Sequence, residues 1–228
     1  MTTEPRPTRW ARGGTANDGY GRRFAELLDH GADLDGEARL ADSLVDRGSR
    51  VLDAGAGMGR VGAALQQRGH RVVAVESDAD LVAQARRTYP DLAVLEADIL
   101  ALSPGLLAEH GLPTEYDLVV CVGNVMIYLA DETEREVLGT LRSLLGPAGR
   151  MLVGFHPVGG PTTSRSYPPA EFVADAEAAG LRVDLRAGSY QLHPPEAAYA
   201  VWVLSRADDG AAPSDHPTPF DDVGRVEG

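Results

Sequence analysis

Short apolar runs alternate with longer amphipathic stretches between residues 18 and 206 of the chain. The apolar runs are rich in Val and Leu, as in VVAV and LVVCV, and charged residues or glycine bound them, which is typical of buried strands. They predict strands over residues 49–55, 70–77, 91–98, 116–123, 150–155, 181–192 and 198–206. The stretches between them have apolar residues at helical spacing and predict helices over 18–30, 35–47, 58–69, 78–89, 131–145 and 170–180.

Polar residues and glycines mark where some of these helices begin and end. Asp78 is expected to cap the helix that it begins, and Asp131 with Glu134 has the spacing of a capping box. Gly48 and Gly69 follow helices in the position of a C-terminal glycine. The stretch 103–112 carries no such pattern, and we expect a loop there with at most one helical turn.

The alternation of strands and helices predicts an α/β fold. Each connection between parallel strands must cross a face of the sheet, so we expect a mostly parallel sheet with helices on both faces. The last two strands have no helix between them and are expected to pair antiparallel. The expected organisation is one domain over 17–206 with a helical cover at 17–48, a flexible N-terminus over 1–16 and a disordered acidic tail over 207–228.

The chain is strongly acidic, with 21 Lys and Arg against 34 Asp and Glu, a formal net charge of −13, and it contains no lysine. Such a protein repels phosphate, so neither nucleic acid nor an anionic membrane is an expected partner. Lysine-dependent Schiff-base chemistry is excluded. The single cysteine, Cys121, allows no intrachain disulfide, and we see no signal peptide or membrane span. We expect a cytoplasmic, bacterial protein.

A glycine-rich segment, VLDAGAGMGRVG over residues 51–62, lies between a predicted strand and a predicted helix. Without side chains the backbone can turn tightly and approach a ligand, and the free N–H groups at the helix start face that ligand. The spacing Gly57-x-Gly59-x-x-Gly62, with Glu76 placed 19 residues after Gly57, also matches the dinucleotide fingerprint. The turn alone leaves open a dinucleotide, another nucleoside ligand or a purely structural role.

Three carboxylates at successive strand ends favour a cationic adenosyl ligand. Asp53 precedes the first glycine, where a carboxylate repels a pyrophosphate but suits a sulfonium and an ammonium group. Glu76 ends the second strand and can accept both ribose hydroxyls. Asp98 ends the third strand and can accept the adenine amine while the Ile99 N–H donates to the ring. Ligands of such sheets bind at the carboxyl ends of the strands, where all three acids lie.

These segments occur together in a known family. VLDAGAGMGRVG, VVAVESD, LEADIL and YDLVVCVGNVMIYL, with the turn LLGPAGRMLVGF, resemble the successive motifs of class I S-adenosylmethionine-dependent methyltransferases. The resemblance implies a three-layer Rossmann-like fold with a seven-stranded sheet in the order 3-2-1-4-5-7-6, the seventh strand antiparallel. It also implies S-adenosylmethionine as the cofactor and S-adenosylhomocysteine as its product.

The resemblance assigns the methionine moiety to the Asp53–Gly59 loop, the ribose to Glu76, the adenine to Asp98 with Ile99, and the methyl-donor side to residues 122–124. N-terminal helices cover the cofactor in the family, so the helix over 18–30 is expected to contribute as well. The expected cofactor-binding residues are Asp53, Gly55, Ala56, Gly57, Gly59, Arg60, Glu76, Ser77, Asp98, Ile99, Val122, Gly123, Asn124, Tyr20 and Arg23.

Methyl transfer is an in-line displacement, so the protein mainly aligns acceptor and methyl group and excludes water. A general base is needed only where the acceptor must lose a proton. His156, His193 and Tyr128 follow strand ends and are candidates, although each also fits a structural role. Cys121 lies within a strand and is expected to be a core residue, and no spacing predicts a metal site.

We therefore expect a methyltransferase that acts on a small molecule, with the acceptor atom (O, N or C) and the choice between monomer and homodimer left open. The loops 124–130 and 156–169 are expected to select the acceptor. Two alternatives remain. One is an NAD-binding oxidoreductase, which rests on the fingerprint at Gly57–Gly62 with Glu76, and the other is a non-catalytic ligand-binding module on the same fold.

Overall fold

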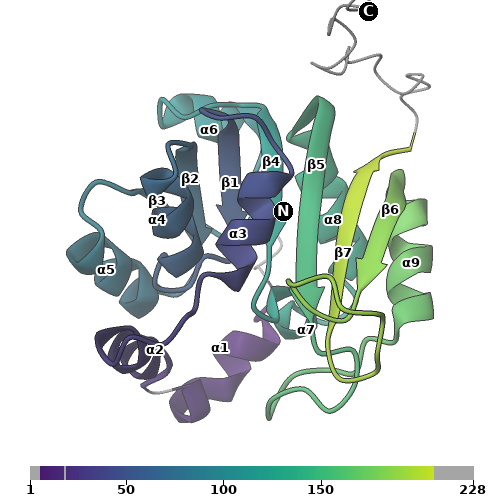
Figure 1. Ribbon diagram of the computed structural model, residues 1–228, viewed down its shortest axis with the longest axis horizontal. Coiled ribbons are helices and arrows are strands. Elements are labelled where there is room, and N and C mark those ends of the chain that lie inside the picture. The colour runs from purple at the N-terminus through teal and green to yellow at the C-terminus, as the bar shows by residue number, and fades with distance from the viewer. Residues whose placement is uncertain (1–5, 18, 208–228) are drawn as a thin grey trace, which may run out of the picture.

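The apolar runs of the sequence form one seven-stranded sheet in the computed structural model, which describes residues 6–17 and 19–207 (Figure 1). The sheet order is β3-β2-β1-β4-β5-β7-β6, with β1 to β5 parallel and β7 antiparallel to both of its neighbours. This confirms the predicted fold class and strand order. The strands are β1 (Arg50–Ala54), β2 (Arg71–Glu76), β3 (Ala93–Glu96), β4 (Tyr116–Cys121), β5 (Leu145–Phe155), β6 (Leu181–Ala187) and β7 (Ala200–Arg206).

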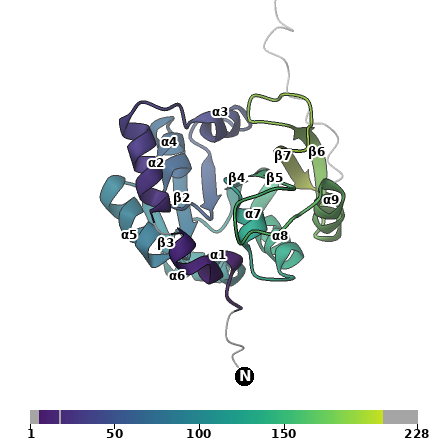
Figure 2. The same ribbon diagram turned by 90° about the horizontal axis from the view of Figure 1, so that it is seen from below.

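Helices cover both faces of the sheet. Seen from below, α3 and α4 lie on one face and α6 and α8 on the other (Figure 2). The α-helices are α1 (Arg9–Gly13), α2 (Tyr20–Asp29), α3 (Gly36–Ser43), α4 (Arg60–Gln67), α5 (Ala79–Thr88), α6 (Pro104–Glu109), α7 (Val125–Tyr128), α8 (Glu134–Ser143) and α9 (Pro169–Ala178), with 3-10 turns η1 (Gly14–Asn17) and η2 (Ile99–Ala101).

The core is divided into two parts by the sheet because side chains alternate along a strand. Val51 of β1 is fully buried in one cluster with Leu65 of α4. The next residue, Leu52, is fully buried in the other cluster with Leu138 of α8. Both faces of the central strands are therefore covered, and the strand ends are held rigidly where a site can be built on them.

The carboxyl ends of the parallel strands point toward one edge of the molecule. The arrowheads of β1 and β5 point toward the edge where α1, α2 and α7 lie (Figure 1). In the view from below, α1 and α2 lie in front of the sheet (Figure 2). The N-terminal elements thus cover the edge of the sheet at which α/β proteins bind their ligands.

The described part of the N-terminus, where we expected a flexible segment over 1–16, contains two short helical elements. Residues 9–17 form α1 and η1, and the Thr8 hydroxyl caps α1 by accepting the Ala11 N–H at 3.0 Å. None of the residues in α1 is buried, so there was no apolar periodicity to predict this helix. Residues 1–5 and the predicted tail over 208–228 lie outside the described part of the chain.

Two expectations of local structure were wrong. Where we expected a loop over 103–112, the chain forms α6. This helix begins with Pro104, and the Ser103 hydroxyl caps its N-terminus. Asp131 and Glu134 form no capping box: α8 begins at Glu134, after Thr133, and Asp131 instead forms ion pairs with Arg9 and Arg12 of α1. For α6, we passed over the helix-start signal of Ser103 and Pro104. For Asp131, contacts with residues distant in the sequence decided the local structure.

Candidate active site

The turn between β1 and α4 has backbone conformations with positive φ, which glycine adopts readily. Gly55 has a φ of +77°, and a Cβ there would lie 2.5 Å from a methyl group of Val125. Gly59 caps α4 with a φ of +84°. The N–H groups of Gly55 and Ala56 both donate to the carbonyl of Val75 at 2.9 Å, so the turn is fixed against the end of β2.

The carboxylate of Glu76 forms the second link between the turn and β2. Its Oε2 accepts the N–H of Gly57 at 2.8 Å, and its Oε1 accepts the N–H groups of Ser77 and Asp78 at 2.8 and 2.9 Å. Burial raises the pKa of Glu76, and these three N–H groups oppose the rise because they stabilise the ionised form. Oε2 accepts one described donor and keeps a lone pair for a ligand.

Asp53 is more deeply enclosed than its position at a strand end suggested. It is 2% exposed, and its Oδ2 accepts the N–H of Gly62 at 2.8 Å, which ties α4 to β1. Burial raises the pKa of Asp53 to about 7, against the lowering effect of that N–H. The carboxyl group lines a cavity of about 40 Å³ that also touches Gly57 and Gly123.

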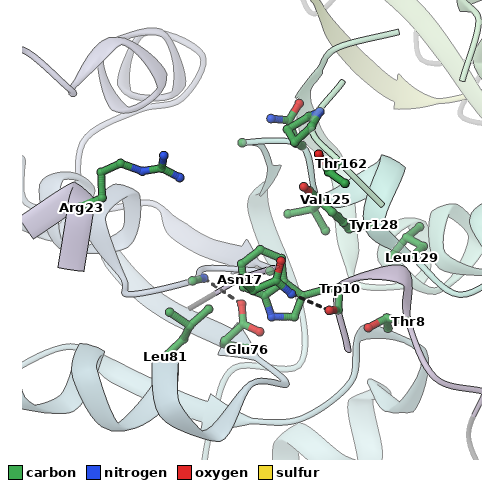
Figure 3. A pocket seen from close by; sticks show the side chains of 15 residues that line it. Thr8, Trp10, Asn17, Arg23, Glu76, Leu81, Val125, Tyr128, Leu129 and Thr162 are labelled. Atoms are coloured by element: carbon green, nitrogen blue, oxygen red, sulfur yellow. Dashed lines mark hydrogen bonds between the residues drawn. The ribbon is translucent and has the colours of Figure 1, made fainter. Parts of the chain in front are cut away.

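A larger cavity of about 340 Å³ lies at the carboxyl ends of β1, β2 and β4 (Figure 3). Glu76 and Arg23 are the charged side chains in its lining, and Arg23 makes no hydrogen bond or ion pair with another described residue. The cavity is lined by Thr8, Trp10, Asn17, Arg23, Gly55, Gly57, Glu76, Leu81, Gly123, Asn124, Val125, Tyr128, Leu129, Pro161 and Thr162.

Several predicted cofactor residues therefore meet around one space. The larger cavity brings together those that end β1, β2 and β4, namely Gly55, Gly57, Glu76, Gly123 and Asn124, with Arg23 from α2. The smaller cavity adds residues on the far side of the same glycine turn, namely Asp53, Ala56, Arg60 and Val122.

Trp10 is a cavity residue that the sequence analysis missed. Its Nε1 donates to Asp78 Oδ2 at 2.8 Å, and its ring packs edge-to-face against Tyr128 with 5.5 Å between centroids. Thr8 and Asn17 of the same N-terminal segment line the cavity as well. The presence of a tryptophan in an otherwise polar segment was the one signal that could have pointed to it.

His156 lines neither of the two cavities, but it contacts Asn124, which lines the larger one. The Oδ1 of Asn124, which lines the cavity, accepts the backbone N–H of His156 at 3.0 Å and lies 2.9 Å from its Nδ1. The His156 ring also packs edge-to-face on Tyr199, with 4.8 Å between centroids. Burial lowers the pKa of His156, which favours the neutral imidazole.

Two predicted cofactor residues have other partners in this structure, and a third is buried outside both cavities. Arg60 pairs with Glu37 of α3 at 2.6 Å, so it holds the helical cover onto α4. Asp98 accepts the N–H of Leu100 at 2.8 Å as the cap of η2. Asp98 and the buried Ile99 line neither of the two cavities described above.

The remaining candidates lie at the margins. Tyr20 is the first residue of α2, but its side chain lies outside the described part of the structure. Ser77 donates its N–H to Glu76. His193 is exposed in the turn between β6 and β7, where its Nδ1 lies 2.9 Å from the Ser189 hydroxyl. Cys121 is fully buried, and burial raises the pKa of its thiol to about 12, as expected for a core residue.

Within residues 6–17 and 19–207, no group of three or more His, Cys, Asp or Glu is placed to hold a metal ion. In that same part of the chain, every helix is too short or too polar to cross a membrane.

The sequence and fold resemble those of known methyltransferases. A family model described as "Methyltransferase domain" matches residues 51–149. The structure of a TehB-like SAM-dependent methyltransferase from Corynebacterium glutamicum is 30% identical, with a TM-score of 0.74 over 84% of this chain and 98% of that one. The chain thus belongs to the S-adenosylmethionine-dependent methyltransferases, which favours the adenosylmethionine interpretation of the glycine turn over the dinucleotide one.

Curated relatives have different acceptors. A ribosomal RNA small subunit methyltransferase A from Anaeromyxobacter dehalogenans is 39% identical over 119 residues, which are 50% of this chain and 40% of the relative. A glycine/sarcosine N-methyltransferase from Halorhodospira halochloris is 28% identical over 143 residues, 60% of this chain and 51% of the relative. The chain spans about half the length of these relatives or less, so their names do not identify its acceptor.

The buried carboxyl group of Asp53 predicts an unusual pH dependence of stability. Its pKa is about 7 in the folded state against an ordinary 3.8. Between these values the folded state binds a proton that the unfolded state has lost, so the free energy of unfolding falls as the pH rises. Asp53→Asn keeps an acceptor for the Gly62 N–H and removes this dependence, which amounts to at most about 4 kcal/mol.

Urea denaturation of both proteins at about pH 5 and about pH 8 measures this effect. The variant is expected to gain stability relative to the wild type at the higher pH. Parallel pH dependence in the two proteins would show that Asp53 is ionised in the folded state at both values.

Proposed function

We propose that this protein transfers the methyl group of S-adenosylmethionine to a small, uncharged acceptor molecule. The proposal rests chiefly on one observation. Glycine backbone, a buried carboxylate with a spare lone pair and an arginine without a described partner converge on a single cavity at the carboxyl edge of the sheet. Such a concave site with a few converging polar groups suits a ligand of drug-like size.

We assign each chemical group of the cofactor to the residue near the cavity whose chemistry suits it. One ribose hydroxyl would donate to Oε2 of Glu76, which accepts only the Gly57 N–H among the described residues. The methionine carboxylate would pair with Arg23, whose guanidinium points into the cavity (Figure 3). Asp53 lies on the other side of the glycine turn, where its ionised form would favour the ligand's positive charge.

The adenine is proposed to lie beside Trp10 and Leu81. Both line the cavity together with Glu76, and an indole offers a flat apolar surface for a base. Asp98 and Ile99 remain predicted partners for the adenine edge. Because neither lines this cavity, they would be reached only where the ligand extends beyond it.

The part of the cavity left for the acceptor carries no charge. Once Glu76, Arg23, Trp10 and Leu81 are assigned to the cofactor, the remaining side chains are neutral: Thr8, Asn17, Asn124, Val125, Tyr128, Leu129, Pro161 and Thr162. An uncharged lining favours an acceptor without a phosphate or a carboxylate. The net charge of −13 likewise opposes RNA, whose binding depends on cationic side chains.

We propose His156 as the base that takes a proton from the acceptor. The Asn124 Oδ1 already accepts the backbone N–H of His156, so it must be an acceptor for Nδ1 as well. The neutral ring is thereby held with its proton on Nδ1, which leaves the lone pair on Nε2 available. An acceptor with a hydroxyl or a heteroaromatic N–H would need such a base.

Glu76→Gln tests the cofactor site. Charge-assisted hydrogen bonds to the ribose are lost, so calorimetric titration is expected to show at least about tenfold weaker binding of S-adenosylhomocysteine. Glu96→Gln is the matched control because Glu96 pairs with Glu76 in register on β3 and is exposed. Equal affinity in Glu76→Gln and the wild type would exclude Glu76 from the site.

The acceptor class is tested with isotopically labelled methyl donor. The protein is incubated with pools of uncharged hydroxyl and heteroaromatic compounds, with amino acids, and with ribosomal RNA, and the products are read by mass spectrometry. Label is expected in the uncharged small molecules. Label that enters only RNA or only amino acids would refute the proposed acceptor, and cofactor binding without any transfer would favour a non-catalytic module.

His156→Gln tests the proposed base. In the wild type, turnover is expected to fall only below about pH 6.5, because burial lowers the pKa of His156 and the base must be neutral. In the variant this limb should disappear, and kcat should fall about 100-fold with cofactor affinity retained. His193→Gln, an exposed histidine elsewhere on the same edge, serves as the control. An unchanged rate and pH profile would leave His156 with a structural role.

A further inference from the structure

A buried carboxylate at the start of α8 connects two segments that are distant in the sequence. The Glu134 side chain is 4% exposed, and its Oε1 binds Nη1 of Arg9 at 3.2 Å and Nη1 of Arg165 at 2.6 Å. We call these three residues the Glu134 cluster. Ion pairs at low exposure are screened little by solvent, so the shared carboxylate constrains both arginines. Each arginine also has a carboxylate partner of its own, Asp131 for Arg9 and Glu171 for Arg165.

The first arm of the cluster holds α1. Arg9 lies between Thr8 and Trp10, which both line the cavity. Besides Glu134, its guanidinium binds Asp131 at 2.6 Å and the Leu129 carbonyl at 2.9 Å. Since α1 contains no buried residue, these polar contacts and the packing of the Trp10 ring on Tyr128 hold it in place.

The second arm holds the loop after β5. Arg165 follows Pro161 and Thr162, which line the cavity. The Arg165 N–H donates to the carbonyl of Ile127 in α7 at 3.1 Å. Its guanidinium lies over the ring of Tyr167, 4.5 Å from the centroid. The loop is thus fixed to α7, as α1 is through Arg9.

We propose that Glu134 is a positioning residue that holds both outer walls of the cavity, α1 with Trp10 and the loop with Thr162, at a fixed separation. Glu134 lines no part of the cavity itself and acts through Arg9 and Arg165. The separation of the walls sets how well the cofactor and the acceptor are enclosed. The effect on ligands rests on the proposed function, whereas the mechanical coupling of the two walls does not.

The coupling is tested first without any ligand. Amide hydrogen exchange of the full chain is compared between the wild type, Glu134→Gln and Glu136→Gln. Glu136 lies in the first turn of the same helix and is exposed, so its variant controls for charge in α8. Glu134→Gln is expected to speed exchange about tenfold in both 6–17 and 157–166. Faster exchange in only one segment, or in neither, would overturn the proposal.

The effect on binding is tested with S-adenosylhomocysteine and the variants Arg9→Gln, Arg165→Gln and their combination. Each arginine variant leaves the core intact, so these proteins test the coupling even where Glu134→Gln folds poorly. We expect the losses of affinity of the two arginine variants to be non-additive. The double variant and Glu134→Gln should have similar affinities, both about tenfold weaker than that of the wild type.

Kinetics separate a positioning role from a general loss of structure. KM for cofactor and acceptor should rise in Glu134→Gln while kcat changes by less than about threefold, because the residue touches neither ligand. Additive losses in the binding series, or a fall in kcat alone, would contradict the proposal. If the wild type bound no S-adenosylhomocysteine, the proposed function would fail, and the exchange experiment would still decide the coupling.

Discussion

The carboxylate of Glu76 holds the candidate site together. It accepts backbone N–H groups from the glycine turn on one side and from the start of the β2–α5 connection on the other. A buried carboxylate is stable only where such donors replace water, so the turn, the end of β2 and the charge depend on one another. The arrangement leaves one oxygen with a free lone pair facing the cavity. The anchor of the turn is therefore also a ready acceptor for a ligand.

The walls of the cavity are built in two physically different ways. The inner wall consists of strand ends such as those that carry Gly55 and Gly123, and the fully buried Val and Leu residues of both core clusters hold them. The outer wall consists of α1 and the loop after β5, which ion pairs hold through the Glu134 cluster. The rigid inner wall suits the cofactor, which is common to the family. The polar attachment of the outer wall allows it to be adjusted without disturbing the core.

The sequence predicted what local patterns determine. The strands were predicted because buried parallel strands are continuous Val and Leu runs, and their ends located Glu76 and the glycines of the turn. The strand order came from the family resemblance rather than from these patterns. Ser103 and Pro104 carried a helix-start signal for α6 that we did not weigh.

Long-range polar contacts could not be predicted in this way. Asp131 has the spacing of a capping residue, but its partners are Arg9 and Arg12, more than a hundred positions earlier in the chain. Arg60 lies in the glycine motif, but its guanidinium pairs with Glu37. Trp10 belongs to a helix without a buried face, so periodicity gave no sign of it. Polar pairing between distant segments has no period, and only the folded chain shows it.

The central claim is that the carboxylates around the glycine turn suit a positively charged adenosyl ligand and oppose a pyrophosphate. Calorimetric titration of the wild-type protein with S-adenosylmethionine and, separately, with NAD tests it most directly. The account predicts saturable binding of S-adenosylmethionine and no heat from NAD. Binding of NAD without binding of S-adenosylmethionine would contradict it.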